Sequence, residues 1–131
     1  MDLPESWKFT KDHEWIAVAS GDAANIGVTP YALEQLGDIV HIELPEVGES
    51  FSQGDSFGTI ESTKTVSDLY MPVAGKIIDV NQDLVAAPEK LSGESLDEGW
   101  LVKIELDDSK SVSDLLSASD YAAFLAEQDD E

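Results

Sequence analysis

Alternation of apolar and polar residues is the feature that most limits the fold of this chain. In the segment Val40–Leu44, Val, Ile and Leu alternate with His and Glu, which is the period of a half-buried β-strand. Glycine-containing turns separate the segments of this kind, and many short strands punctuated in this way predict a barrel or sandwich rather than a parallel α/β sheet. The other predicted strands are Glu14–Ala19, Ala24–Val28, Ser56–Glu61, Thr65–Tyr70, Lys76–Val80 and Trp100–Leu106.

Two short helices are predicted among the strands. Thr29-Pro30 supplies an N-cap and a proline in the first turn of a helix that Gly37 ends. A capping box, Ser117-Ala-Ser-Asp120, begins a second helix over residues 117–127. No linker interrupts the 131 residues, so we expect one domain spanning 1–131 with the C-terminal helix packed on it. The apolar face of that helix is formed by Tyr121, Phe124 and Leu125.

The charge balance excludes several classes of partner. Twenty-eight acids oppose seven lysines, arginine is absent, and the net charge is −21. Such a surface repels nucleic acids and anionic membranes. The absence of cysteine excludes disulfides, thiol catalysis and thiolate metal sites. With no signal-like start, we expect a bacterial cytoplasmic protein, or a mitochondrial matrix protein if the chain is processed from a eukaryotic precursor.

Residues suited to catalysis or metal binding are few. The two histidines, His13 and His41, are not spaced as metal ligands, and we interpret them as surface or rim residues. No nucleophile elbow, calcium loop or glycine-rich phosphate loop is present. The acidic residues are explained by a solvated surface, so the sequence indicates no catalytic residue and no metal site.

Lys64 stands apart from the other lysines. It lies between Glu61 and Asp68 in a stretch of small hydroxyl residues, at the predicted tip of a hairpin. Small neighbours leave its amine accessible to an acylating enzyme, so Lys64 is a candidate attachment point. The other interpretation of the pattern is an ordinary surface lysine.

Several motifs in order along the chain carry a family resemblance. They are Phe9-Thr-Lys-Asp-His-Glu-Trp15, Gly27-Val-Thr-Pro-Tyr-Ala-Leu-Glu-Gln-Leu-Gly-Asp-Ile-Val40, Glu43-Leu-Pro-Glu-Val-Gly48, Glu61-Ser-Thr-Lys-Thr-Val-Ser-Asp68, Pro72-Val-Ala-Gly75 and Glu98-Gly-Trp-Leu101. Over nearly its whole length the chain resembles the H-protein family of the glycine cleavage system, whose members are lipoate-bearing carriers.

The resemblance implies a fold, a cofactor and site residues. The implied fold is a mainly β barrel-sandwich hybrid of the lipoyl and biotinyl carriers, with short helices. Lys64 matches the lysine that carries lipoic acid as a covalent N6-lipoyl group. Glu61 matches the acid that the lipoyl-attaching enzyme recognises. Glu14 and Asp68 match acids that contact the loaded arm.

The resemblance also implies a non-catalytic role among several enzymes. Such a carrier takes the aminomethyl group of glycine from a pyridoxal-phosphate glycine decarboxylase and passes it to a folate-dependent aminomethyltransferase. Dihydrolipoyl dehydrogenase then restores the disulfide. We expect a monomer that meets these enzymes transiently, with its negative field steering encounters with basic surfaces.

One segment departs from the family pattern. Ser92-Gly-Glu-Ser-Leu-Asp97 replaces the usual Asn-x-x-Pro-Tyr-Gly, which opens the question of which enzymes this chain serves. The alternative is an H-protein-like lipoyl carrier of another complex, such as heterodisulfide-reductase-like sulfur oxidation. A third hypothesis, an unmodified β-rich interaction module or an enzyme, predicts no acylation of Lys64.

Overall fold

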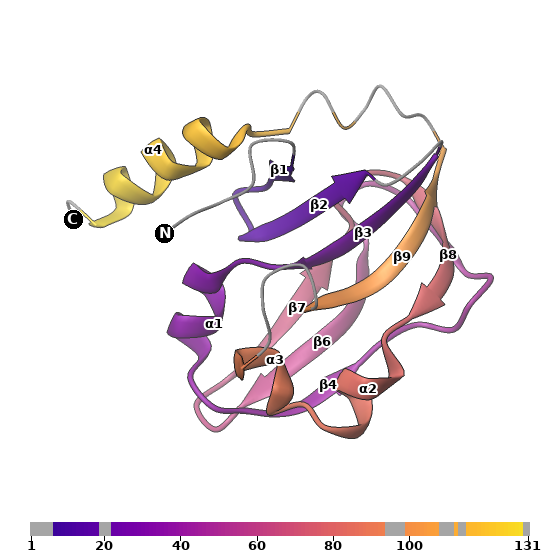
Figure 1. Ribbon diagram of the computed structural model, residues 1–131, viewed down its shortest axis with the longest axis horizontal. Helices are drawn as coiled ribbons and strands as arrows, with labels where there is room; N and C mark the ends of the chain where they lie inside the picture. The colour runs from indigo at the N-terminus through magenta and orange to yellow at the C-terminus, as the bar shows by residue number, and fades with distance from the viewer. Residues whose placement is uncertain (1–6, 19–21, 94–98, 108–111, 113–114, 130–131) are drawn as a thin grey trace.

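A computed structural model describes residues 7–18, 22–93, 99–107, 112 and 115–129 (Figure 1). The order of its elements is β1 (Lys8–Phe9), β2 (Glu14–Val18), β3 (Ala23–Val28), α1 (Pro30–Leu36), β4 (Ile39–Glu43), β5 (Ser50–Phe51), β6 (Ser56–Ser62), β7 (Val66–Tyr70), β8 (Gly75–Val80), α2 (Gln82–Ala86), α3 (Lys90–Gly93), β9 (Trp100–Leu106) and α4 (Ala118–Asp129).

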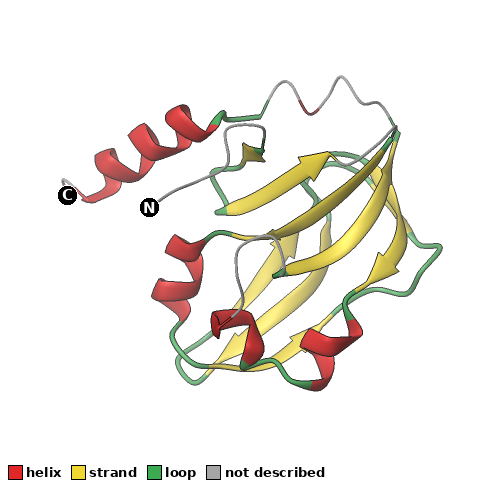
Figure 2. Ribbon diagram, viewed as in Figure 1, coloured by secondary structure: helices red, strands yellow, loops and turns green. Residues whose placement is uncertain are grey.

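The strands form two antiparallel sheets. Six strands follow the order β1-β2-β3-β9-β8-β5, and three follow the order β4-β6-β7. Figure 2 draws the strands in yellow and the helices in red. The apolar residues of the alternating pattern from both sheets meet in one core, as expected when each sheet buries one face. This arrangement confirms the predicted mainly β, sandwich-like class. Residues buried without any exposure in this core include Ile16, Ile26, Ile60, Ile77 and Ile104.

The seven strands predicted from alternation are confirmed, with bounds that differ by no more than one residue at either end. The predicted hairpin is formed by β6 and β7, whereas β8 belongs to the other sheet. Four elements were not predicted from the sequence, each only two to five residues long: β1, β5, α2 and α3. The atypical segment 92–97 lies largely outside the described residues, since 94–98 are not described.

The C-terminal helix packs against β1 and the neighbouring aromatic residues at one edge of the six-stranded sheet. The N–H of Asp120 donates to Ser117 Oγ over 3.2 Å, which confirms the predicted start of α4. Tyr121 is fully buried in a cluster with Phe9 and Trp15. In Figure 1, α4 lies beyond β1 at one side of the molecule.

Helix α1 joins the two sheets and ends beside the hairpin. Thr29 Oγ1 accepts a hydrogen bond from the N–H of Ala32, as the predicted N-cap requires. Gly37 ends the helix with a φ of +80°, a conformation that glycine adopts at little cost. Among the described residues, no helix is both long and apolar enough to cross a membrane.

Candidate functional site

The turn between β6 and β7 holds Lys64 in a defined backbone position. Ser62 Oγ accepts hydrogen bonds from the N–H groups of Lys64 and Thr65 at 3.2 and 3.1 Å. The N–H of Ser62 donates to the carbonyl oxygen of Thr65 at 2.8 Å. Ser62 is buried and Lys64 is exposed. The turn therefore fixes the lysine backbone while leaving its amine in solvent.

A second contact fixes the turn to the end of α1. The N–H of Thr63 donates to the carbonyl oxygen of Asp38 over 3.1 Å. A Cβ atom built on Gly37 would lie 3.5 Å from Cε and 3.6 Å from Nζ of Lys64. The lysine side chain thus lies over the glycine that ends α1, where the absence of a side chain leaves room for it.

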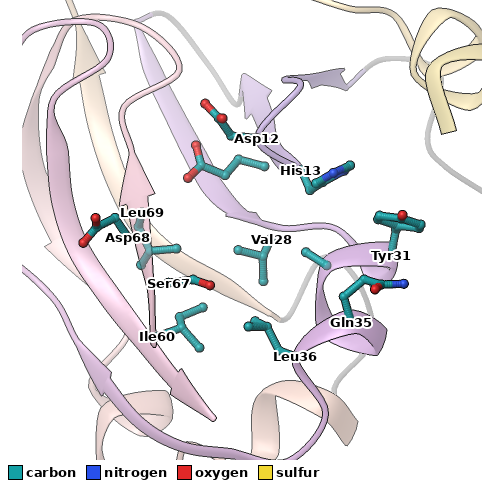
Figure 3. Close-up of a pocket in the computed structure, with 12 residues that line it drawn as sticks. Asp12, His13, Val28, Tyr31, Gln35, Leu36, Ile60, Ser67, Asp68 and Leu69 are labelled. Carbon is teal, nitrogen blue, oxygen red and sulfur yellow. The ribbon is translucent and has the colours of Figure 1, made fainter. Parts of the chain in front are cut away.

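Next to this turn lies a cleft of about 310 Å³ between α1, the start of β2 and the inner face of the β6–β7 hairpin (Figure 3). Leu36, the residue before Gly37, lines it, so the cleft begins close to the base of Lys64. Apolar side chains line it together with polar and charged ones, a combination that suits a ligand with both apolar and polar parts. The apolar lining residues include Val28, Leu36, Ile60 and Leu69.

Glu14 is the buried acid of this cleft, with only 2% of its surface exposed. Its Oε2 accepts a hydrogen bond of 2.7 Å from the N–H of Tyr70. Its Oε1 has no hydrogen-bond partner among the described residues. Burial raises the pKa of Glu14 to about 8, with the Tyr70 hydrogen bond opposing the shift and nearby Asp12 adding to it. At neutral pH the acid is therefore mostly protonated, with one oxygen free for a ligand.

Asp68 and Ser67 point to opposite sides of the hairpin. Asp68 is paired with Thr59, and Ser67 is paired with the fully buried Ile60. Figure 3 shows the Ser67 oxygen turned toward α1 and the Asp68 carboxylate turned the other way. Asp68 is exposed and accepts a hydrogen bond from the Tyr70 hydroxyl at 3.4 Å. Ser67 is thus an inward polar group that the sequence analysis did not single out, although its register with Ile60 could have indicated it.

His13 lies at the rim of the cleft and connects it to α4. Its Nδ1 lies 2.8 Å from the Tyr121 hydroxyl, which also lies 2.7 Å from Thr29 Oγ1, the N-cap of α1. His13 has a φ of +66°, and burial lowers its pKa while Asp12 opposes that shift. Burial raises the pKa of Tyr121 to about 12, so this hydroxyl stays protonated. The network joins α4, α1 and the loop before β2 around one side of the cleft.

Glu61 and His41 lie on the outer face of the three-stranded sheet, where they are paired with each other. Both are exposed, and His41 Nε2 is 3.5 Å from a carboxylate oxygen of Glu43. His41 is therefore the surface histidine that the sequence analysis expected. Among the residues described, no group of three or more His, Asp or Glu side chains is arranged to hold a metal ion.

Comparisons with known proteins agree with one another. The family model described as glycine cleavage H-protein matches residues 7–128. A glycine cleavage system H protein of Halothermothrix orenii is 49% identical over 127 residues, covering 97% of this chain and 98% of that protein. A glycine cleavage system H protein from Anaeromyxobacter sp. strain K is 45% identical over 129 residues, covering 98% of this chain and 100% of that protein. The crystal structure of a glycine cleavage system H protein from Mycobacterium marinum matches with a TM-score of 0.86 at 41% identity, covering 95% of this chain and 99% of that one.

Proposed function

The chain belongs to the glycine cleavage H-protein family, and we propose that it carries a lipoyl group on Lys64 and shuttles the aminomethyl group of glycine between the enzymes of that system. The observation that carries this proposal is the position of Lys64, which is fixed through its backbone, exposed at its side chain and next to a cleft with a buried acid.

Attachment requires an accessible amine. The neutral Nζ attacks the acyl carbon of an activated lipoyl ester held by the attaching enzyme. An amide bond forms, the ester bond breaks, the leaving group departs with its electron pair, and the nitrogen releases one proton. Thr63 and Thr65, the small neighbours of Lys64, are exposed and leave the amine open to such an enzyme. Glu61 is proposed as the acid that this enzyme recognises.

The cleft suits the loaded arm. A bound lipoyl group would supply a disulfide that accepts the aminomethyl group as CO2 leaves, and a dithiol that is reoxidised afterwards. A carrier must shield a bound ammonium from water, and burial of that charge requires a partner. Glu14 offers the free Oε1, and Ser67 offers a hydroxyl from the opposite wall. An ammonium beside Glu14 favours its ionised form, so docking of the arm releases a proton from this acid.

Asp68, the other acid implied by the family resemblance, has a different geometry. It lines the rim of the cleft, but its carboxylate is exposed and engaged by Tyr70 on the outer side. Contact with a buried arm would require a change of its rotamer. We therefore assign the main contact with the ammonium to Glu14 and a lesser one to Asp68.

The proposed role is that of a carrier without catalysis of its own. Its proposed partners are glycine decarboxylase, the aminomethyltransferase, dihydrolipoyl dehydrogenase and a lipoyl-attaching enzyme. Its proposed location is the bacterial cytoplasm, and the relatives named above come from bacteria. Tethering raises the local concentration of the arm at each active site. The relatives named above are glycine cleavage proteins, which favours this system over a carrier role in sulfur oxidation.

Intact mass spectrometry after incubation with a lipoate ligase tests the attachment site. The wild-type protein should gain one lipoyl group and Lys64→Arg should gain none. Lys76→Arg is the matched control, because Lys76 is an exposed lysine on β8, and this variant should be modified like the wild type. A lipoyl group on Lys64→Arg, or none on the wild type, would contradict the assignment.

The choice of partner system has its own test. The lipoylated protein, mixed with a glycine decarboxylase, should support exchange of labelled CO2 into the carboxyl group of glycine. A fully lipoylated protein that is inert with several glycine decarboxylases would instead support a carrier role in another complex.

A further inference from the structure

The outer face of the three-stranded sheet carries an apolar pair beside the lysine. In β4, Ile39 is paired with Ser62 and His41 with Glu61, which leaves Val40 without a partner residue at a β-bulge. A bulge turns two successive side chains to the same face, and here Val40 and His41 are both exposed while Ile39 and Ile42 are buried. The bulge thus places a valine, 49% exposed, on the solvent side.

A second exposed valine lies in the same row of residues across β4, β6 and β7. Val66, the first residue of β7, is paired with Glu61 from the other side and is 58% exposed. Glu61 therefore lies between Val66 on one flank and the β4 bulge, with Val40 and His41, on the other. The next row of the same face adds the acids Glu43 and Asp68. Both valines are turned away from the core and leave about half of their surface exposed to solvent.

The reach of a lysine side chain indicates what this surface meets. Nζ lies roughly 6 Å from its own Cα when the side chain is extended. An enzyme that forms a bond to Nζ must therefore contact the surface around the turn. Enzymes that meet only the dithiolane end of the finished arm act at roughly twice that distance. The surface immediately beside Lys64 is thus more constrained by attachment than by the later steps.

We infer that Val40, Glu61 and Val66 form the docking surface for the lipoyl-attaching enzyme, here called the valine platform. The inference rests on the proposed attachment at Lys64. It fits an enzyme surface with a basic group opposite Glu61, flanked by apolar side chains that cover the two valines. Acids in the next row extend the negative potential toward such a basic surface. The cleft opens on the inner side of the hairpin, so an enzyme on the platform leaves it free.

The test compares exposed valines beside and away from Lys64. The double variant Val40→Thr, Val66→Thr keeps the shape and strand propensity of both residues but makes the surface polar. Val47→Thr is the control, because Val47 is also 58% exposed but lies in the segment between β4 and β5. The kcat/KM of lipoylation, followed by intact mass, should fall about tenfold in the double variant and stay at the wild-type value in the control.

Three results would overturn the inference. Lipoylation of the double variant at the wild-type rate would show that the valines are not contacted. An equal loss in Val47→Thr would show a general effect of surface polarity. Once fully lipoylated, the double variant should lose much less of its rate of glycine–CO2 exchange than it lost of its kcat/KM of lipoylation. An equal loss in both would mean that the valine platform is also contacted by glycine decarboxylase and is not specific to the attaching enzyme. None of these results depends on Lys64→Arg, whose modification would contradict the proposed function itself.

Discussion

The two faces of the β6–β7 hairpin differ in chemistry although their residues alternate along the same two strands. Ile60, Ser67 and Leu69 face inward, where they line the cleft that holds Glu14. Glu61 and Val66 face outward beside Lys64 and are exposed. A strand period of two therefore separates a surface suited to shielding a bound group from one suited to enzyme contact, within one short element.

Of the changes predicted here, truncation of a buried side chain should give the largest difference in the free energy of unfolding between the inner and the outer face of the hairpin. Ile60→Ala removes a fully buried side chain and should lower the free energy of unfolding by about 2–5 kcal/mol. Thr59→Ala, at the neighbouring outward position, should cost only about 0.5 kcal/mol. Urea unfolding followed by circular dichroism measures both. Equal costs would mean that the hairpin is not packed through one face.

The pH dependence of stability distinguishes the buried acid from the exposed one. The pKa of Glu14 is about 8 in the folded protein and lies near 4.3 in an unfolded chain. Between these values the folded state binds more protons, so this acid lowers stability as pH rises, until the effect levels off above pH 8. Glu14→Gln removes the effect. Its stability relative to wild type should therefore increase by roughly 4 kcal/mol from pH 5 to pH 9.

The matched control for this measurement is Glu61→Gln. Glu61 is exposed, so the stability of this variant relative to wild type should change little across the same pH range. Urea unfolding at several pH values gives both curves. A flat curve for Glu14→Gln would show that Glu14 is ionised in the folded protein.

A smaller loss of stability is expected from a change at the rim of the cleft. Tyr121→Phe removes the hydroxyl that contacts His13 and Thr29, and should cost about 1–2 kcal/mol because half-buried His13 Nδ1 loses this partner and buried Thr29 Oγ1 keeps only its bond from the N–H of Ala32. Tyr31→Phe is the control, since Tyr31 meets His13 only through its ring, at 4.7 Å between ring centres. Thermal unfolding measures both, and equal costs would argue against the network.

The smallest effect concerns Asp68. Asp68→Asn should leave the free energy of unfolding within about 0.5 kcal/mol of the wild type, because the side chain is exposed. The loaded arm should also release ammonia more slowly in Asp68→Asn than in Glu14→Gln. Ammonia release as fast as in Glu14→Gln would mean that Asp68 turns inward when the arm is loaded.

Local patterns were sufficient to predict much of this fold. Alternation predicted the long strands, and Thr29 with Gly37 predicted both ends of α1, because these signals depend on neighbours in sequence. The strands β1 and β5 have two residues each and exist only through pairing with β2 and β8. Helix α2 follows Asn81, a residue type favoured at N-caps, but the Asn81 side chain makes no cap hydrogen bond and donates instead to the carbonyl oxygen of Trp100.

The site was less predictable because its chemistry depends on distant residues. The turn around Lys64 could be placed from local composition. The burial of Glu14 could not, since it depends on the far strands, and its hydrogen bond comes from Tyr70, 56 residues away. The partner of His13 is more distant still, at Tyr121, 108 residues away. From sequence alone, an acid at the start of a strand is interpreted as a surface residue, because the opposing sheet that buries it is not visible in the local pattern.

The most direct test of the account is the titration of Glu14 by carboxyl ¹³C NMR in the lipoylated protein, before and after loading with glycine and a glycine decarboxylase. The free-arm form should titrate with a pKa of about 8. In the loaded form the ammonium against Glu14 should lower that pKa by at least about one unit. An unchanged midpoint after complete loading, confirmed by intact mass, would contradict the claim that the inner face of the hairpin receives the aminomethyl arm.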